Sequence, residues 1–205
     1  MTIVDKIIKP ENCFLGICLP VKKDDFISSL DPKCHKTYSK IREKKLGYNL
    51  ETLWEEDHLP LVNLILEKKK ELERLGVKVC LDFSLVDMDH VWSYDVITIF
   101  AHHDDKVRMI ELFDKMYDVR DIISHVPLDK NKIIDLTMCR SIALQTAIKT
   151  HRPNCIVAAN KMETNPEFRF LCYKKAIELL QSKDINYIDA IKEVRILLLH
   201  SIKKQ

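Results

Sequence analysis

The sequence predicts an α/β protein in which a mostly parallel sheet carries helices on both faces. Short runs rich in valine and isoleucine alternate along the chain with longer segments whose apolar residues recur at helical spacing. Continuous apolar runs are typical of strands that are buried on both faces, and strands joined through helices pair in parallel. With 205 residues the chain has the size of one domain, so we expect residues 1–205 to form a single α/β domain.

The first half of the chain contains two predicted strands and one long helix. The first strand, 12–21, ends near Pro20, because proline cannot donate a hydrogen bond within a central strand. The next segment, 22–57, is polar with helix-like pieces, and we interpret it as an insertion at the edge of the sheet. A helix is predicted over 59–75, where leucines recur at helical spacing up to a glycine, and a second strand over 77–83 follows.

The second half alternates strands and helices more regularly. A third strand over 94–101 is followed by a hairpin arm near 109–113 and by a short helix over 119–126 that Asp118 caps. The remaining predicted elements are strands over 132–138 and 154–159 and helices over 140–150, 166–182 and 187–202. This alternation is typical of repeated strand–helix–strand units.

Composition and charge exclude several functions. Lysine and arginine barely outnumber aspartate and glutamate, 33 against 31, so the charge does not favour a nucleic-acid partner. No apolar run has the length of a membrane span. Only three glycines occur, so neither a dinucleotide-binding turn nor a phosphate loop can be assembled. We therefore expect no cofactor, no membrane contact and no nucleic-acid partner.

The seven cysteines are odd in number, scattered, and mostly embedded in apolar runs. This distribution is typical of reduced, buried thiols, and no Cys-x-x-Cys pair predicts a structural zinc site. The N-terminus lacks the charged-then-apolar pattern of a signal peptide. We expect a cytoplasmic protein whose thiols are reduced and which holds no metal.

Two of the predicted strands end in residues that are capable of catalysis. His102 and His103 follow the strand over 94–101, and Cys139 follows the strand over 132–138. The carboxyl ends of parallel strands meet at one edge of a sheet, where ligands bind. A helix start after Cys139 and an imidazole on the adjacent strand favour the thiolate, the nucleophilic form of cysteine. The sequence therefore predicts a Cys–His pair, with His103 as the base instead of His102 if the strand is shifted by one residue.

The order of these motifs resembles the caspase-like cysteine proteases, and within them the CHAT branch that is found largely in bacteria. The matching motifs are a histidine strand over 97–103, an intervening segment with Ile110-Glu111-Leu112 and residues 118–123, and a cysteine strand over 134–141. In the tail, a helix with aromatic residues precedes a helix of the type Tyr-x-x-Ala-x-x-x-x-Arg, here Tyr187 to Arg195. The resemblance covers about residues 94–202. It implies a caspase-like sheet and a cysteine endopeptidase that acts on protein or peptide substrates under the control of a partner protein.

Carried over to this chain, the resemblance assigns a role to each residue around the pair. His102 is the general base, and Cys139 is the nucleophile. His103 takes the place of a glycine whose amide contributes to the oxyanion hole. Arg140 follows the nucleophile, as in the Ala-Cys-Arg motif of the family. Thr137 stands two residues before the nucleophile, where some relatives carry a residue that sets substrate specificity.

Asp135 lies four residues before Cys139, on the same face of the predicted strand. A carboxylate in an apolar strand needs a partner. Two roles are open for it: a buried hydrogen-bonding group beneath the site, or a substrate-binding group.

Two other functions are compatible with the sequence. The run from Ala101 to Asp105 is similar to the Ala-His-Pro-Asp-Asp turn of PIG-L-type zinc deacetylases, although Lys106 stands where a glutamate is expected. The chain is also compatible with a caspase-like domain that has lost catalysis and serves as a scaffold or partner-binding module. In that case residues 22–57 would be the natural partner surface.

Overall fold

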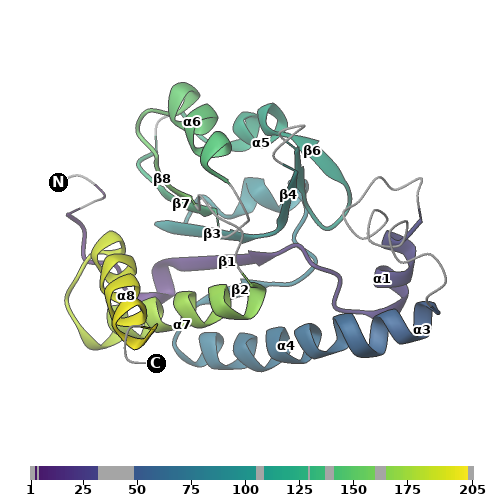
Figure 1. Ribbon diagram of the computed structural model, residues 1–205. Coiled ribbons are helices and arrows are strands. Elements are labelled where there is room, and N and C mark those ends of the chain that lie inside the picture. Colours follow the sequence, from purple (N-terminus) through teal and green to yellow (C-terminus); the bar gives the residue numbers. More distant parts are fainter. Residues whose placement is uncertain are drawn as a thin grey trace.

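The computed structural model describes residues 3, 5–31, 49–104, 109–128, 130–136, 141–159 and 165–202, with the backbone alone at 103, 104 and 198–202 (Figure 1). Five strands form one sheet in the order β2-β1-β3-β7-β8, and all neighbouring strands are parallel. They are β1 (Cys13–Ile17), β2 (Lys78–Cys80), β3 (Val96–Phe100), β7 (Ile133–Leu136) and β8 (Ile156–Ala159). The predicted α/β class with a mostly parallel sheet is confirmed.

Helices cover both faces of this sheet (Figure 1). On one face lie α4 (Leu59–Arg74), α7 (Pro166–Ser182) and α8 (Tyr187–Ile202), and on the other α5 (Val119–His125) and α6 (Ile142–His151). The central strand β3 is buried along its whole length. Val96 and Phe100 belong to the core beneath α4, α7 and α8, whereas Ile97 and Ile99 belong to the core beneath α5 and α6. The alternation of side chains along a strand thus supplies both cores.

A second, antiparallel sheet begins directly after β3. Its strands are β4 (His102–Asp104), β5 (Met109–Glu111) and β6 (Met116–Asp118), in the order β4-β5-β6. Only Ala101 separates β3 from β4, so the chain passes from one sheet into the other at the carboxyl end of the central strand. The hairpin arm predicted near 109–113 is confirmed as β5 and β6.

The chain between β1 and β2 is helical over most of its described residues. Helix α1 (Lys23–Ser29) follows β1, whereas α3 (Leu50–Thr52) and a π-helical segment, η3 (Leu53–His58), lead without a break into α4. The helix predicted to start at residue 59 therefore starts at residue 50. Three consecutive exposed acidic residues at 55–57 obscured the helical pattern, although their neighbours Trp54 and His58 are buried. The predicted insertion 22–57 thus contains α1 and the start of this helix, and its residues 32–48 lie outside the described part of the chain.

The other helices match their predictions closely, while the strands are shorter. Helices α7 and α8 have the predicted bounds, and α6 starts at Ile142 rather than at 140. Asp118 caps α5 as predicted, since its carboxylate accepts a hydrogen bond of 2.8 Å from the backbone N–H of Arg120. Strand β2 stops at Cys80, because Asp82 has a φ of 56°, which extended backbone does not allow. Two short 3-10 helices, η1 (Pro10–Asn12) and η4 (Leu85–His90), precede β1 and β3.

Helix α4 ends at the predicted glycine. Gly76 has a φ of +100°, which is accessible to glycine at little cost. Its N–H donates to the carbonyl of Glu73, and the N–H of Val77 donates to that of Leu72, both at 3.0 Å. These two bonds form a Schellman motif, which turns the chain from α4 into β2.

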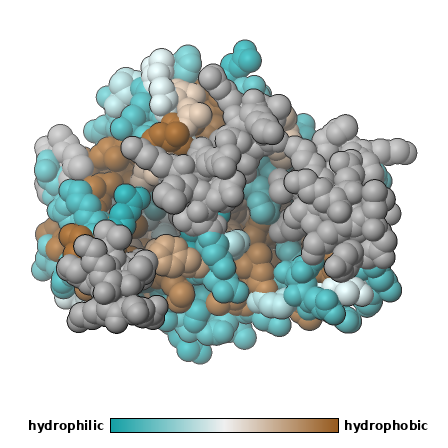
Figure 2. All heavy atoms as spheres, in the orientation of Figure 1, coloured by the Kyte–Doolittle hydropathy of each residue, from teal (hydrophilic) through white to brown (hydrophobic). Residues whose placement is uncertain are grey.

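The surface is mixed in polarity. Figure 2 shows largely hydrophilic side chains along the lower part of the molecule, where α4 lies in Figure 1, as expected for the solvent face of an amphipathic helix. Among the described residues, no helix combines the length and apolar character needed to span a membrane.

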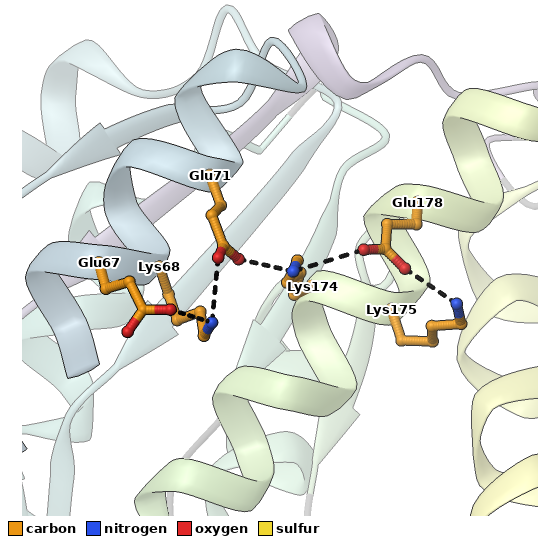
Figure 3. Close-up of polar contacts among 6 residues, drawn as sticks. All are labelled: Glu67, Lys68, Glu71, Lys174, Lys175 and Glu178. Carbon is orange, nitrogen blue, oxygen red and sulfur yellow. Dashed lines mark hydrogen bonds and ion pairs between the residues drawn. The ribbon is translucent and has the colours of Figure 1, made fainter.

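An ion-pair network joins α4 to α7 (Figure 3). Glu71 of α4 lies 2.6 Å from the Nζ atom of Lys174 on α7 and 3.1 Å from that of Lys68 on its own helix. Lys174 also lies 3.6 Å from Glu178, and Lys68 lies 2.7 Å from Glu67. The hydrogen bonds from Lys174 and Lys68 hold the pKa of Glu71 below its ordinary value. Glu71 is therefore the carboxylate that links the two helices electrostatically.

We expect Glu71→Gln to lower the free energy of unfolding by about 1 kcal/mol in urea denaturation, because it weakens the contacts to both helices. The difference from the wild type should shrink in about 1 M NaCl, which screens exposed charges. Glu67→Gln is the matched control. Its side chain is 62% exposed and pairs only within α4, so a change below about 0.5 kcal/mol is expected. Equal effects of the two substitutions would contradict a linking role for Glu71.

Candidate active site

The carboxyl edge of the sheet contains a topological switch point between β1 and β3. After β1 the chain returns to the sheet as β2, which lies on one side of β1. After β3 it returns as β7, which lies beside β3 on the opposite side of the sheet. In open α/β sheets, ligands bind in the crevice that forms where the strand order reverses. Here the segment after β1 stays close to β3, since the N–H of Cys18 donates to the carbonyl of Phe100 at 2.9 Å. His102, two residues after Phe100, lies at this switch point.

The register of β3 and β7 determines where the chain leaves the sheet on its way to Cys139. Ile99 of β3 pairs with Leu136 of β7. His102 is three residues beyond Ile99, and Cys139 is three residues beyond Leu136. The described residues on either side of Cys139 are tied together, because the hydroxyl of the buried Ser141 donates to the carbonyl of Leu136 at 3.1 Å. Helix α6 then starts directly after Ser141.

Four of the predicted site residues cannot be placed in full. Thr137, Cys139 and Arg140 lie outside the described residues. The backbone of His103 belongs to β4 and pairs with Ile110, but its side chain is also outside the described part.

His102 is suited to accept a proton. Its side chain is partly exposed as a whole, whereas its Nε2 atom is buried. Burial lowers the pKa of this imidazole below its ordinary value, the carboxylate of Glu111 acts in the opposite direction, and the positive charge of Arg169 lowers the pKa further. The ring is therefore neutral at neutral pH, which is the form that a general base requires.

A second histidine lies close to His102. His58, at the end of η3, has its Nε2 atom 2.7 Å from the carbonyl of Pro20 and stacks on the ring of Phe26 at a centroid distance of 4.3 Å. Its pKa is lowered, mainly by burial, and the charge of His102 contributes to the lowering. His58 thus connects the chain after β1 to the helix that leads into α4.

Sequence reasoning missed three residues around His102, namely His58, Glu111 and Arg169. Arg169 was detectable, because it lies four residues before the buried Tyr173 and hence on the core face of α7. Glu111 was noted only as part of the Ile110-Glu111-Leu112 motif. A charged residue between two apolar residues of a short strand is itself a signal, because such a residue is rarely buried without a partner. His58 directly precedes the predicted helix and had no such signal.

The described thiols are poor nucleophiles. Burial raises the pKa of all five of them, including Cys18, the one nearest the switch point by strand position. A raised pKa removes the reactive thiolate at neutral pH. Of the seven cysteines in the sequence, only Cys34 and Cys139 fall outside the described residues.

Asp135 has a structural partner. It is buried in β7 and accepts a hydrogen bond of 2.6 Å from the hydroxyl of Tyr187 on α8. Its neighbour across the sheet is the buried Thr98. Burial raises the pKa of this carboxyl to about 6, although the Tyr187 hydrogen bond and the charge of Arg195 act in the opposite direction. Of its two predicted roles, this contact favours the buried hydrogen-bonding group beneath the site.

Among the described residues, no group of three or more histidine, cysteine, aspartate or glutamate side chains is arranged to hold a metal ion. The zinc-binding alternative depends on Asp104 and Asp105, whose side chains are outside this part of the chain. No protein-family model matches the sequence, and no curated protein matches it significantly.

We expect Asp135→Asn to remove a pH dependence of stability. The folded state binds the Asp135 proton more tightly than the unfolded chain, so this group makes stability fall as the pH rises from about 4 to about 6. The variant avoids the buried charge and should gain up to about 3 kcal/mol on the wild type between pH 4 and pH 7. Urea denaturation across this range measures the difference. A difference that stays constant with pH would contradict a raised pKa at Asp135.

Proposed function

We propose that this chain is a caspase-like cysteine endopeptidase in which Cys139 attacks the peptide carbonyl and His102 transfers the proton. The supporting observation is the register of β3 and β7, because both residues stand three positions beyond the paired Ile99 and Leu136. Adjacent strands run about 4.8 Å apart, so the two segments leave the sheet as neighbours at the same edge.

Three further features support this assignment. Burial raises the pKa of all five described thiols, which disfavours their thiolate form and supports Cys139 as the reacting cysteine. The Ser141 hydroxyl donates to the carbonyl of Leu136, which ties together the described residues on either side of Cys139. Helix α6 starts three residues after Cys139, and the positive end of its dipole favours a thiolate nearby.

The proposed reaction proceeds through an acyl-enzyme. The thiol proton of Cys139 passes to His102, and the thiolate sulfur bonds to the scissile carbonyl carbon while the carbonyl electrons move to oxygen. Backbone N–H groups close to Cys139 stabilise this oxyanion. The intermediate collapses, the carbon–nitrogen bond breaks, and the amine leaves with the proton from His102. A water molecule then hydrolyses the thioester with His102 as base, which releases the acid and restores the thiol.

The proposal also includes the substrate, the regulation and the cellular location of the enzyme. The resemblance to the CHAT branch favours a protein substrate and control by a partner protein. All five described cysteines are free, which supports a reducing, cytoplasmic location. The inactive scaffold and the zinc deacetylase are the competing functions, and the following experiment separates them.

We expect the purified protein to cleave members of a peptide library, and Cys139→Ala to abolish cleavage. His102→Ala should lower kcat/KM by at least about a hundredfold, since it removes the general base. Cys155→Ala is the matched control, because this buried thiol lies before β8 at the opposite edge of the sheet and should leave turnover unchanged. Circular dichroism verifies that all variants are folded.

Turnover that survives Cys139→Ala in the folded protein would contradict the mechanism. Absence of cleavage by the wild type, also with cell extract added as a source of partners, would favour the scaffold. One equivalent of bound zinc in the wild type, lost in His102→Ala or Asp105→Ala, would establish the deacetylase alternative in its place.

A further inference from the structure

We propose that Glu111 is a positioning residue for His102, which holds the imidazole in one orientation and stabilises the imidazolium formed when the thiol proton is transferred. The inference rests on the proposed function, because it adds a third member to the Cys139–His102 pair. It concerns the pairing of two described strands, β4 and β5. It can therefore be tested even if the protein does not catalyse peptide cleavage.

The strand pairing places the two residues opposite each other. In the antiparallel pair of β4 and β5, His102 is the direct partner of Glu111. Residues directly opposite in an antiparallel pair project from the same face, with Cβ atoms about 4.5–5.5 Å apart. A glutamate side chain at this spacing reaches the ring of a facing histidine.

Glu111 is held in place by its surroundings. It lies in β5, the middle strand of the small sheet, where it also pairs with Met116 of β6. Its side chain is only 4% exposed. A buried carboxylate is unfavourable unless charged or hydrogen-bonding groups compensate it, and an imidazolium on the facing residue His102 is such a group.

Among the described residues, electrostatic effects link His102 to three charged or titratable groups on different elements. Glu111 of β5 raises the pKa of His102 against the dominant effect of burial, and Arg169 of α7 lowers it. His58 of η3 is close enough for the charge of His102 to lower its own pKa. Arg169 also lies over the ring of Phe100, 5.7 Å from its centroid. Within the described part of the chain, Glu111 favours the protonated imidazole, whereas burial and Arg169 disfavour it.

The role in the reaction follows from the two ring nitrogens of histidine. One nitrogen takes the proton from the Cys139 thiol, while the N–H on the other donates a hydrogen bond to the Glu111 carboxylate. Glu111 only accepts this hydrogen bond and is not a partner in the proton transfer. It fixes the tautomer of the neutral ring and lowers the energy of the imidazolium.

The test is an NMR titration of 15N-histidine-labelled protein, with the His102 resonances assigned from a His102→Gln variant. We expect Glu111→Gln to lower the pKa of His102 by about one unit. In peptide cleavage the same variant should lower kcat about tenfold with KM unchanged, which corresponds to one pKa unit. Glu178→Gln, which removes the same charge from the α4–α7 network, should change neither quantity.

Each outcome bears on the proposal. An unchanged His102 pKa in folded Glu111→Gln overturns it, and so does a shifted pKa with unchanged kcat in an active protein. If Glu111→Gln fails to fold, Glu111→Asp carries the test, because it withdraws the carboxylate by one methylene and should shift the pKa in the same direction by less. If the wild type cleaves no peptide, the titration still decides whether Glu111 acts on His102, so this failure is distinct from a failure of the proposed function.

Discussion

The burial of β3 on both faces and both edges is the constraint on which the rest of the structure depends. Every residue of this strand is buried, so each backbone N–H and C=O must find its partner in β1 or β7. Strands on both sides fix β3 at the centre of the sheet, with one core above it and another below. Its carboxyl end then lies where the strand order reverses, and His102 follows there after one residue. The position of the proposed base is therefore a consequence of how the sheet is buried.

Polar groups on the helical layer of α7 and α8 tie that layer to the carboxyl half of the sheet. Tyr187 donates to Asp135 of β7, and Arg169 lies over Phe100 of β3. The first contact joins α8 to the strand that precedes the proposed nucleophile, and the second places a positive charge near the proposed base. Because both are buried, the two helices act on the site through electrostatics as well as through packing. The last part of the chain is thus linked to both halves of the proposed dyad.

Local sequence patterns predicted the helices and strands, whereas the surroundings of His102 depend on contacts between segments that are distant in the sequence. The periodicity of α7 and α8 yielded their bounds, and Asp118 marked the start of α5, because caps and apolar stripes are local signals. The start of the α4 helix was missed, since exposed acidic residues interrupt the apolar pattern there. The histidines and Cys139 were chosen by residue type at the ends of predicted strands, and their pairing stays a prediction. Helical spacing could have shown that Arg169 faces the core, but the approach of Arg169 and Glu111 to His102 was not predictable, because it depends on the packing of α7 and on strand register.

The central claim is that Cys139 and His102 act as one unit, and the reactivity of the thiol tests it most directly. Alkylation by iodoacetamide would be followed across pH, with each cysteine quantified by mass spectrometry, in the wild type and in His102→Ala. The account predicts that Cys139 reacts with a midpoint well below the value of about 8.5 for an ordinary thiol, and that the midpoint rises in His102→Ala. A midpoint near 8.5 in both proteins would contradict it.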